Sequence, residues 1–182
     1  MNAEKLIANT LSVLVATAAI SASAQLVIIL PSEVSVAPIT GQSLAVLMTA
    51  SLLGWKNGGL SVLLYLILGV LGVPVFSEFT SGWEAFTGPS LGYFIGFLIA
   101  TIVIGVIAAK QANTFSNFFL QMTIGTVIIL ICGGIGLFRF LEFSGILQKG
   151  ILPFLPGTLV KMLVGAVFLS VYYKIKLLLK PV

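Results

Sequence analysis

Six apolar stretches separated by short polar connections constrain the fold of this chain more than any other feature. A helix needs ~20 predominantly apolar residues to cross the hydrocarbon core of a bilayer. Only 8% of the residues are charged, against roughly 25% in a soluble domain, so a soluble fold would have too little polar surface. We therefore predict a single-domain, all-α integral membrane protein over residues 1–182. Its six transmembrane helices are expected at approximately 10–30, 42–55, 58–76, 88–109, 118–138 and 153–174.

The second stretch, 42–55, is short enough to be a re-entrant segment, but the placement of lysines indicates that it crosses. Lys and Arg in short loops mark the cytoplasmic side of a membrane. If 42–55 did not cross, Lys5 and Lys56 would lie on opposite sides. We therefore predict six crossings with both termini inside, in a bacterial cytoplasmic (inner) membrane. The inner side then holds Lys5, Lys56, Lys110, Lys174, Lys176 and Lys180 with Glu4, and the outer side holds Glu33, Glu78, Glu84, Glu142, Arg139 and Lys149.

Lys161 most needs an explanation, because it lies inside the last apolar stretch. An ammonium group buried in a membrane helix costs at least ~2.5 kcal/mol, and such residues usually face the bundle interior or a cavity. The alternative is a lysine whose stem follows the helix and whose charge reaches the outer headgroups. We favour a cationic contact for an anionic or polar group of a ligand.

Other polar and aromatic side chains gather at the outer ends of the predicted helices. Thr40 and Gln42 bring a hydroxyl and an amide to the start of the second helix, either to bind a ligand or, for Thr40, to cap the helix. Arg139 is either a ligand contact or half of a surface ion pair with Glu142. Several aromatic residues lie at the end of the third stretch and after it, where they form an interfacial belt or line a pocket. They are Phe76, Phe79, Trp83, Phe86 and Tyr93.

The first stretch carries Ala18 and Ala22 at a spacing of four. This spacing puts small side chains on one face of a helix, where a second helix can approach closely. The second helix belongs either to this chain or to another subunit. The tripeptide that ends at Ala24 also resembles a signal-peptide cleavage site, and cleavage there would leave five helices.

The residues that are missing exclude several function classes. The chain has no His, no Asp and one cysteine, Cys132, so we expect no metal site and no bound cofactor. Its five glutamates lie in loops or at the terminus, and no nucleotide-binding loop occurs, so we predict neither an enzyme nor an ATPase. The basic residues form no patch for nucleic acid. Without an inverted repeat, we expect a binding module that depends on something else for energy or lets solute pass passively.

Short motifs stand in order over most of the chain, namely Pro38-Ile39-Thr40, Gln42, Gly54, Tyr65, Gly69, Gly72-Val73-Pro74-Val75-Phe76, Gly82, Gly88-Pro89-Ser90, Gly92-Tyr93, Gly96-Phe97, Pro153-Phe154-Leu155-Pro156-Gly157 and Lys161. In the order and spacing of these motifs the chain resembles the BioY family, the biotin-binding S components of energy-coupling factor (ECF) transporters. The chain departs from the family's pattern at two points. Gly41 stands where the family usually has a residue other than glycine, and Thr158 stands where it usually has Asp.

The resemblance implies a six-helix S-component bundle that captures biotin from outside. It also implies docking on a transmembrane coupling protein, whose two cytoplasmic ATPases supply the energy, through the face of Ala18 and Ala22. Lys161 would meet either the carboxylate or the ureido carbonyl of biotin, and Phe76 would cover the thiophane ring. The other expected substrate-binding residues are Thr40, Gln42, Tyr65, Ser90, Tyr93, Thr158 and Arg139.

Two other readings of the function stay open. Thr158 in place of the family's Asp leaves room for an S component that binds another small vitamin or precursor. A structural membrane protein or assembly factor without a ligand is the second. The sequence also leaves open whether the chain forms a homo-oligomer.

Overall fold

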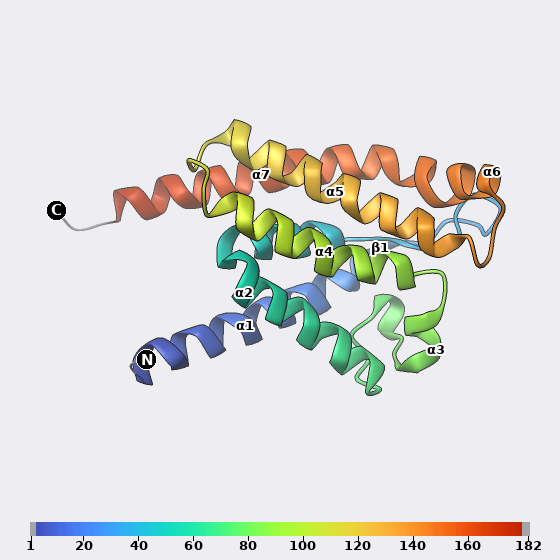
Figure 1. The fold of residues 1–182 in the computed structure, drawn as a ribbon, viewed down its shortest axis with the longest axis horizontal. Coiled ribbons are helices and arrows are strands. Elements are labelled where there is room, and N and C mark those ends of the chain that lie inside the picture. Colours follow the sequence, from blue (N-terminus) through green and yellow to red (C-terminus); the bar gives the residue numbers. More distant parts are fainter. Residues whose placement is uncertain (1–2, 180–182) are drawn as a thin grey trace.

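The computed structural model describes residues 3–179 and shows a bundle of long helices lying side by side (Figure 1). Five of these helices are long and apolar enough to cross a membrane, counting the last one together with the helical turns that precede it. The main helices are α1 (Ala3–Ala24), α2 (Gln42–Val70), α4 (Leu91–Ala108), α5 (Phe115–Leu137) and α7 (Leu155–Leu178). The shorter elements are β1 (Val27–Ile28), β2 (Ile39–Thr40), the 3₁₀ turn Ser77–Phe79, α3 (Gly82–Thr87), α6 (Phe143–Gly145), the π-helical turn Ile146–Ile151 and the 3₁₀ turn Leu152–Phe154.

Helix α2 reverses its direction at Gly54, whose backbone has φ 71° and ψ −177°. The Gln42 side-chain amide donates a hydrogen bond to the Tyr65 hydroxyl, although 23 positions of straight helix would separate them by ~34 Å. The two halves of α2 are therefore antiparallel neighbours, as the two predicted stretches 42–55 and 58–76 require. The first half, 42–53, is only ~18 Å long at 1.5 Å per residue, so the count of six crossings stays a prediction.

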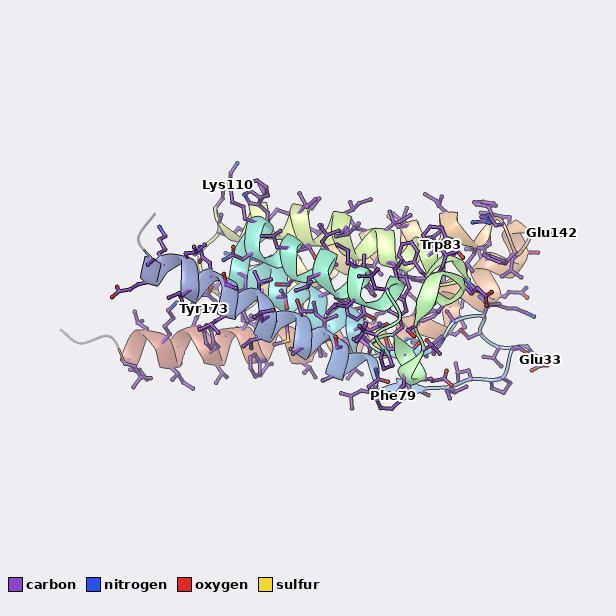
Figure 2. All side chains as sticks on the ribbon, turned by 90° about the horizontal axis from the view of Figure 1, so that it is seen from below. Glu33, Phe79, Trp83, Lys110, Glu142 and Tyr173 are labelled. Atoms are coloured by element: carbon purple, nitrogen blue, oxygen red, sulfur yellow. The ribbon has the colours of Figure 1, made fainter. Side chains whose placement is uncertain are left out.

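The charged residues separate toward the two ends of the bundle. Gly105, near the end of α4, packs against Gly54 and Trp55, so the reversal of α2 and the α4–α5 connection share one end. The start of α1 and the last turns of α7 lie at this end too (Figure 1). Figure 2 shows Lys110 at this lysine-rich end, and Glu33 and Glu142 at the opposite, acid-rich end. The grouping of charges matches the prediction, except that Lys180 lies outside the described residues.

Helix α1 ends at Ala24 rather than at residue 30, and it begins at Ala3 rather than at residue 10. Gln25 leaves the helix, because its amide donates to the Phe76 carbonyl (2.9 Å) and its side-chain oxygen accepts from the Phe79 N–H (3.0 Å). The β-branched residues that follow form β1, in which Val27 lies opposite Thr40 of β2. The predicted boundary was wrong because a short apolar run does not distinguish helix from strand.

The connections between the long helices contain more structure than the apolar stretches indicated. Helix α2 ends at Val70 rather than at residue 76, because Gly72 has φ 98° and Pro74 cannot donate a backbone hydrogen bond. Helix α4 begins at Leu91 rather than at residue 88, after the separate helix α3. Helix α7 runs from Leu155 to Leu178, slightly later than the predicted 153–174, and α5 begins at Phe115 rather than at residue 118.

The core lies between α2, α4 and α5, and the outside of the bundle is apolar. Gly92 of α4 faces Gly136 of α5 so closely that a Cβ on Gly92 would lie 2.9 Å from the Gly136 Cα. Helix α1 joins this core through Thr17, whose hydroxyl donates to the Ser61 carbonyl (3.0 Å). Many large apolar side chains on α1, α5 and α7 are exposed. An apolar exterior of this kind suits a lipid environment.

Candidate functional site

A cavity of about 50 Å³ lies within the acid-rich half of the bundle. Its walls come from the starts of α2, α4 and α7, the second half of α5, and the connections before α2, α4 and α7. These segments meet because α2, α4 and α7 begin, and α5 ends, at the acid-rich end of the bundle. The lining residues are Ala37, Pro38, Thr40, Gln42, Ser43, Ser77, Ser90, Tyr93, Phe94, Phe97, Thr126, Ile129, Leu130, Phe154, Thr158 and Lys161.

Lys161, Ser43 and Thr126 form the floor of the cavity. They also line a smaller cavity of about 10 Å³, whose other walls include Met122 and Leu47. Both of these residues lie further from the acid-rich end along their helices. The partly buried Lys161 ammonium donates to the Ser43 hydroxyl at 3.3 Å. The side chain therefore points into the bundle toward α2, which supports the prediction of an inward-facing lysine over a snorkelling one.

Thr40, Gln42 and Tyr65 form a hydrogen-bonded group beside the cavity. The Thr40 hydroxyl donates to the Gln42 side-chain oxygen (2.8 Å) and accepts from the Gln42 backbone N–H (3.3 Å). The Gln42 amide nitrogen donates to the Tyr65 hydroxyl. Tyr65 is fully buried and does not line the cavity, whereas Thr40 and Gln42 do. Thr40 thus satisfies a backbone donor at the start of α2, and Tyr65 holds the Gln42 amide in place.

The hydroxyl groups of Tyr93 and Thr158 line the cavity but already have partners in the chain. Buried Tyr93 donates to the Gly150 carbonyl at 2.6 Å, which ties α4 to the π-helical turn. Thr158 donates to the Leu155 carbonyl at 2.8 Å, one turn before Lys161 on the same helix. By contrast, the Ser90 hydroxyl lines the cavity and makes no side-chain hydrogen bond within residues 3–179.

The aromatic residues after α2 divide into two groups. Phe76 is buried behind the cavity wall, where it stacks on Phe94 with a ring-centroid distance of 4.8 Å. Phe86 also stacks on Phe94, with a ring-centroid distance of 5.8 Å. Phe79 and Trp83 are instead exposed near the acid-rich end (Figure 2). Phe76 and Phe86 therefore pack behind the cavity wall and do not line it, contrary to the pocket prediction, whereas Tyr93 does line it. The exposure of Phe79 and Trp83 fits the interfacial alternative.

The structure does not bring Arg139 to the cavity. It lies exposed just beyond α5, with its guanidinium 5.8 Å from the Phe140 ring centroid. Ala18 and Ala22 are also remote from the cavity, on the exposed face of α1, whereas Ile20 and Ala24 face inward. The cavity and the small-residue face are thus separate surfaces.

Sequence reasoning missed several lining residues, of which Ser43, Ser77 and Thr126 carry hydroxyl groups. Ser43 directly follows Gln42, so its place next to a predicted ligand residue could have indicated that it lines the same cavity. Thr126 is a polar residue within an apolar helix, which is a weak signal because threonine is common there. Within residues 3–179 no group of His, Cys, Asp and Glu could hold a metal ion.

Comparison with known proteins places the chain in a family. The model of the BioY family matches residues 1–177. The probable biotin transporter BioY of Pyrococcus horikoshii is 38% identical over 124 residues, which cover 68% of this chain and 73% of that protein. The probable biotin transporter BioY of Rickettsia prowazekii is 30% identical over 170 residues, covering 93% of this chain and 86% of that protein.

A solved structure matches the fold over nearly the whole chain. The crystal structure of the S-component for biotin from an ECF-type ABC transporter has a TM-score of 0.83 and 28% sequence identity. The match covers 96% of this chain and 95% of that chain. It confirms the predicted S-component type of helical membrane bundle. The chain therefore belongs to the BioY family.

Proposed function

We propose that this protein captures biotin from the outer side of a bacterial cytoplasmic (inner) membrane and delivers it inward as the substrate-binding subunit of an ECF-type transporter. One observation carries the proposal: a cavity lined by both apolar and polar side chains, with a partly buried lysine at its floor, lies in a bundle that matches the S-component for biotin. Biotin has an apolar thiophane and valeryl body between a ureido ring and a carboxylate, which suits such a lining. Membership of this transport family also agrees with the prediction that the chain is not an enzyme.

The cavity of about 50 Å³ is smaller than the roughly 300–1,000 Å³ of typical ligand pockets. Biotin therefore requires the cavity to widen. The segments between the long helices contribute Pro38, Ser77 and Ser90 to the mouth, whereas Phe97 and Ile129 come from packed helices. We expect the widening to come from the segments between helices, because their backbone is not held by a continuous helix.

Equilibrium binding of labelled biotin to the detergent-purified chain tests the proposal. We expect saturable binding at sub-micromolar concentration without ATP, with competition by unlabelled biotin and none by an unrelated vitamin. A folded protein that binds no biotin would contradict the proposal. Uptake into proteoliposomes against a gradient by this chain alone would contradict the need for energy-supplying partners.

The proposed partners are a transmembrane coupling protein and two cytoplasmic ATPases. The exposed position of Ala18 and Ala22 on α1 supports this part, because small exposed side chains let a helix of another subunit approach closely. The same face would serve a second copy of the chain in a homo-oligomer. Purification with and without the coupling protein, followed by mass measurement, distinguishes the two assemblies.

The proposed topology has six crossings with both termini inside. The lysine-rich end of the bundle supports this orientation, since lysines in short loops favour the cytoplasmic side. Single cysteines at Glu33 and Lys110, in a chain with Cys132 replaced by serine, test it by labelling from outside. We expect the cysteine at position 33 to react in intact cells and that at position 110 to react only after permeabilisation.

Thr158 supports a second candidate function, an S component for another small vitamin or precursor. Its hydroxyl is already bonded to the Leu155 carbonyl, so it offers the ligand less than the Asp that the family usually has there. Competition of labelled biotin with dethiobiotin and a panel of vitamins separates the two candidates. A competitor that binds far more tightly than biotin would favour the second.

A further inference from the structure

We propose that a groove at the lysine-rich end of the bundle binds the headgroup of an anionic phospholipid. The groove has a volume of about 540 Å³ and lies between the α4–α5 connection and the last turns of α7. This volume falls within the roughly 300–1,000 Å³ of typical ligand sites. None of its lining residues belongs to the cavity at the acid-rich end, so the inference does not depend on the proposed function. The lining residues are Asn113, Ser170, Tyr173, Lys174, Lys176 and Leu177.

The first support is the charge of the groove. Lys174 and Lys176 are exposed and line it, and Lys110 lies in the same connection as Asn113 (Figure 2). Within residues 3–179 no acidic side chain lines the groove, and Glu4, the acid of this end, stands in the first turn of α1. The lining thus carries two positive charges and no negative one. Basic pockets between membrane helices are typical sites for anionic headgroups.

The second support is the set of hydrogen-bond donors beside these charges. The Lys176 ammonium lies 5.7 Å from the centroid of the Tyr173 ring and 5.9 Å from that of the Tyr172 ring, so cation–π contacts hold it at the groove. Tyr173 in turn stacks on Phe118 of α5, with a ring-centroid distance of 5.4 Å. The Tyr173 hydroxyl and the Asn113 amide make no hydrogen bond within residues 3–179. A phosphate group accepts several hydrogen bonds, so it can use both donors together with the lysines.

The third support is the apolar surface around the groove, which distinguishes a phospholipid from a free phosphate ion. Leu177 lines the groove itself. Phe115, Val171 and Leu178, on the two helices that frame it, are all at least 45% exposed. Membrane binding of this kind grows with the apolar area that is buried as well as with the attraction between charges. The groove and its surroundings therefore fit a ligand with an anionic head and apolar chains.

The alternative is that these lysines only mark one side of the membrane and stabilise the C-terminal end of α7. In that case any two lysines at this end of the bundle would attract anionic lipid equally. Lys5 and Lys56 provide the matched control, because they lie at the same end and do not line the groove. Two double variants with the same loss of charge therefore separate a specific site from general attraction.

Native mass spectrometry of the detergent-purified chain gives the Kd for the first bound molecule of phosphatidylglycerol, which is anionic, and of phosphatidylcholine, which has no net charge. A lysine near an anionic lipid surface contributes about fivefold in affinity, so two lysines contribute about 30-fold. We therefore expect the wild-type protein to prefer phosphatidylglycerol by about 30-fold when the acyl chains are the same. Equal affinity for the two lipids would overturn the inference, and this test needs no variant.

The double variant Lys174→Gln/Lys176→Gln removes both charges of the groove and keeps polar side chains. We expect its preference for phosphatidylglycerol to fall to about onefold, with an unchanged Kd for phosphatidylcholine. The control Lys5→Gln/Lys56→Gln should retain the wild-type preference. An equal fall in the two double variants would show general attraction and reject the site, and so would an unchanged preference in the groove variant.

Inorganic phosphate separates the lipid from a soluble anion. We expect millimolar phosphate to leave bound phosphatidylglycerol in place, because a free ion gains nothing from the apolar surface. Displacement by phosphate would reject the lipid as the occupant of the groove. Thermal unfolding in the same detergent shows whether the variants are folded, and a lowered Tm in the groove variant would leave the comparison of the two lipids in wild-type protein as the deciding test.

Discussion

Replacement of Gly54 by alanine tests the reversal of α2, on which the position of Gln42 depends. The residue has φ 71° and ψ −177°, a backbone region that is essentially restricted to glycine. The space around it is open, since the nearest heavy atom to an added Cβ would be the Gly105 carbonyl oxygen at 4.0 Å. Any loss of stability in Gly54→Ala therefore comes from the backbone conformation and not from a steric clash.

The size of the effect follows from this geometry. A residue other than glycine in such a conformation costs about 1–3 kcal/mol, so the free energy of unfolding should fall by that amount. Gly59 provides a matched control in the same helix, because an added Cβ there would meet nothing within 4 Å and no left-handed φ is present. Alanine in the interior of a helix is favoured over glycine by roughly 0.5–1 kcal/mol, so Gly59→Ala should leave the stability unchanged or raise it.

Thermal unfolding in one detergent, followed by tryptophan fluorescence, compares the two variants, and Trp55 lies directly beside the reversal. We expect a lower Tm for Gly54→Ala and an equal or higher Tm for Gly59→Ala. Labelled biotin then measures whether the remaining folded protein keeps its site. The reasoning is refuted if Gly54→Ala unfolds at the wild-type temperature, or if both variants lose stability equally.

Three further predictions concern the partner face, an outer cation and an anchor of the cavity wall. Ala22→Leu adds bulk to the exposed face of α1, so it should reduce biotin uptake in cells with the coupling subunits and leave biotin binding intact. The control variant Ala109→Leu should affect neither uptake nor binding. A parallel loss of binding and uptake in Ala22→Leu would contradict this prediction. Arg139→Ala should leave the Kd for biotin unchanged, because the residue lies outside the cavity. The Kd is measured by titration with labelled biotin, and a tenfold increase would instead support the ligand role predicted from the sequence. Tyr93→Phe removes the 2.6 Å hydrogen bond to the Gly150 carbonyl and should lower the free energy of unfolding by about 1 kcal/mol, measured by denaturant titration in detergent, with an unchanged midpoint counting against the anchor.

Two positions show why the site was only partly predictable. The inward direction of Lys161 was predicted, because a buried ammonium has few alternatives to the bundle interior. Arg139 lies just beyond the end of α5, where a long cationic side chain can stay exposed or turn to a ligand with little difference in energy, and in the structure it is exposed. The position of a charged residue in the sequence thus predicts the direction of its side chain when the alternative would expose the charge to lipid, which is costly. At a helix end that cost is absent, and the direction is not predictable in this way.

The sequence alone determined the class of the protein, because helices that face lipid are long, continuous apolar stretches that can be recognised directly in the sequence. It also determined which charges share an end, because the helices alternate in direction. Only the tertiary structure decided where α1 ends, because the strand pairing of Val27 with Thr40 and the hydrogen bonds of Gln25 depend on residues far along the chain. It likewise decided which polar groups already have a partner, such as the Gln42 amide and the Tyr93 hydroxyl, because their partners Tyr65 and Gly150 come from distant positions in the chain.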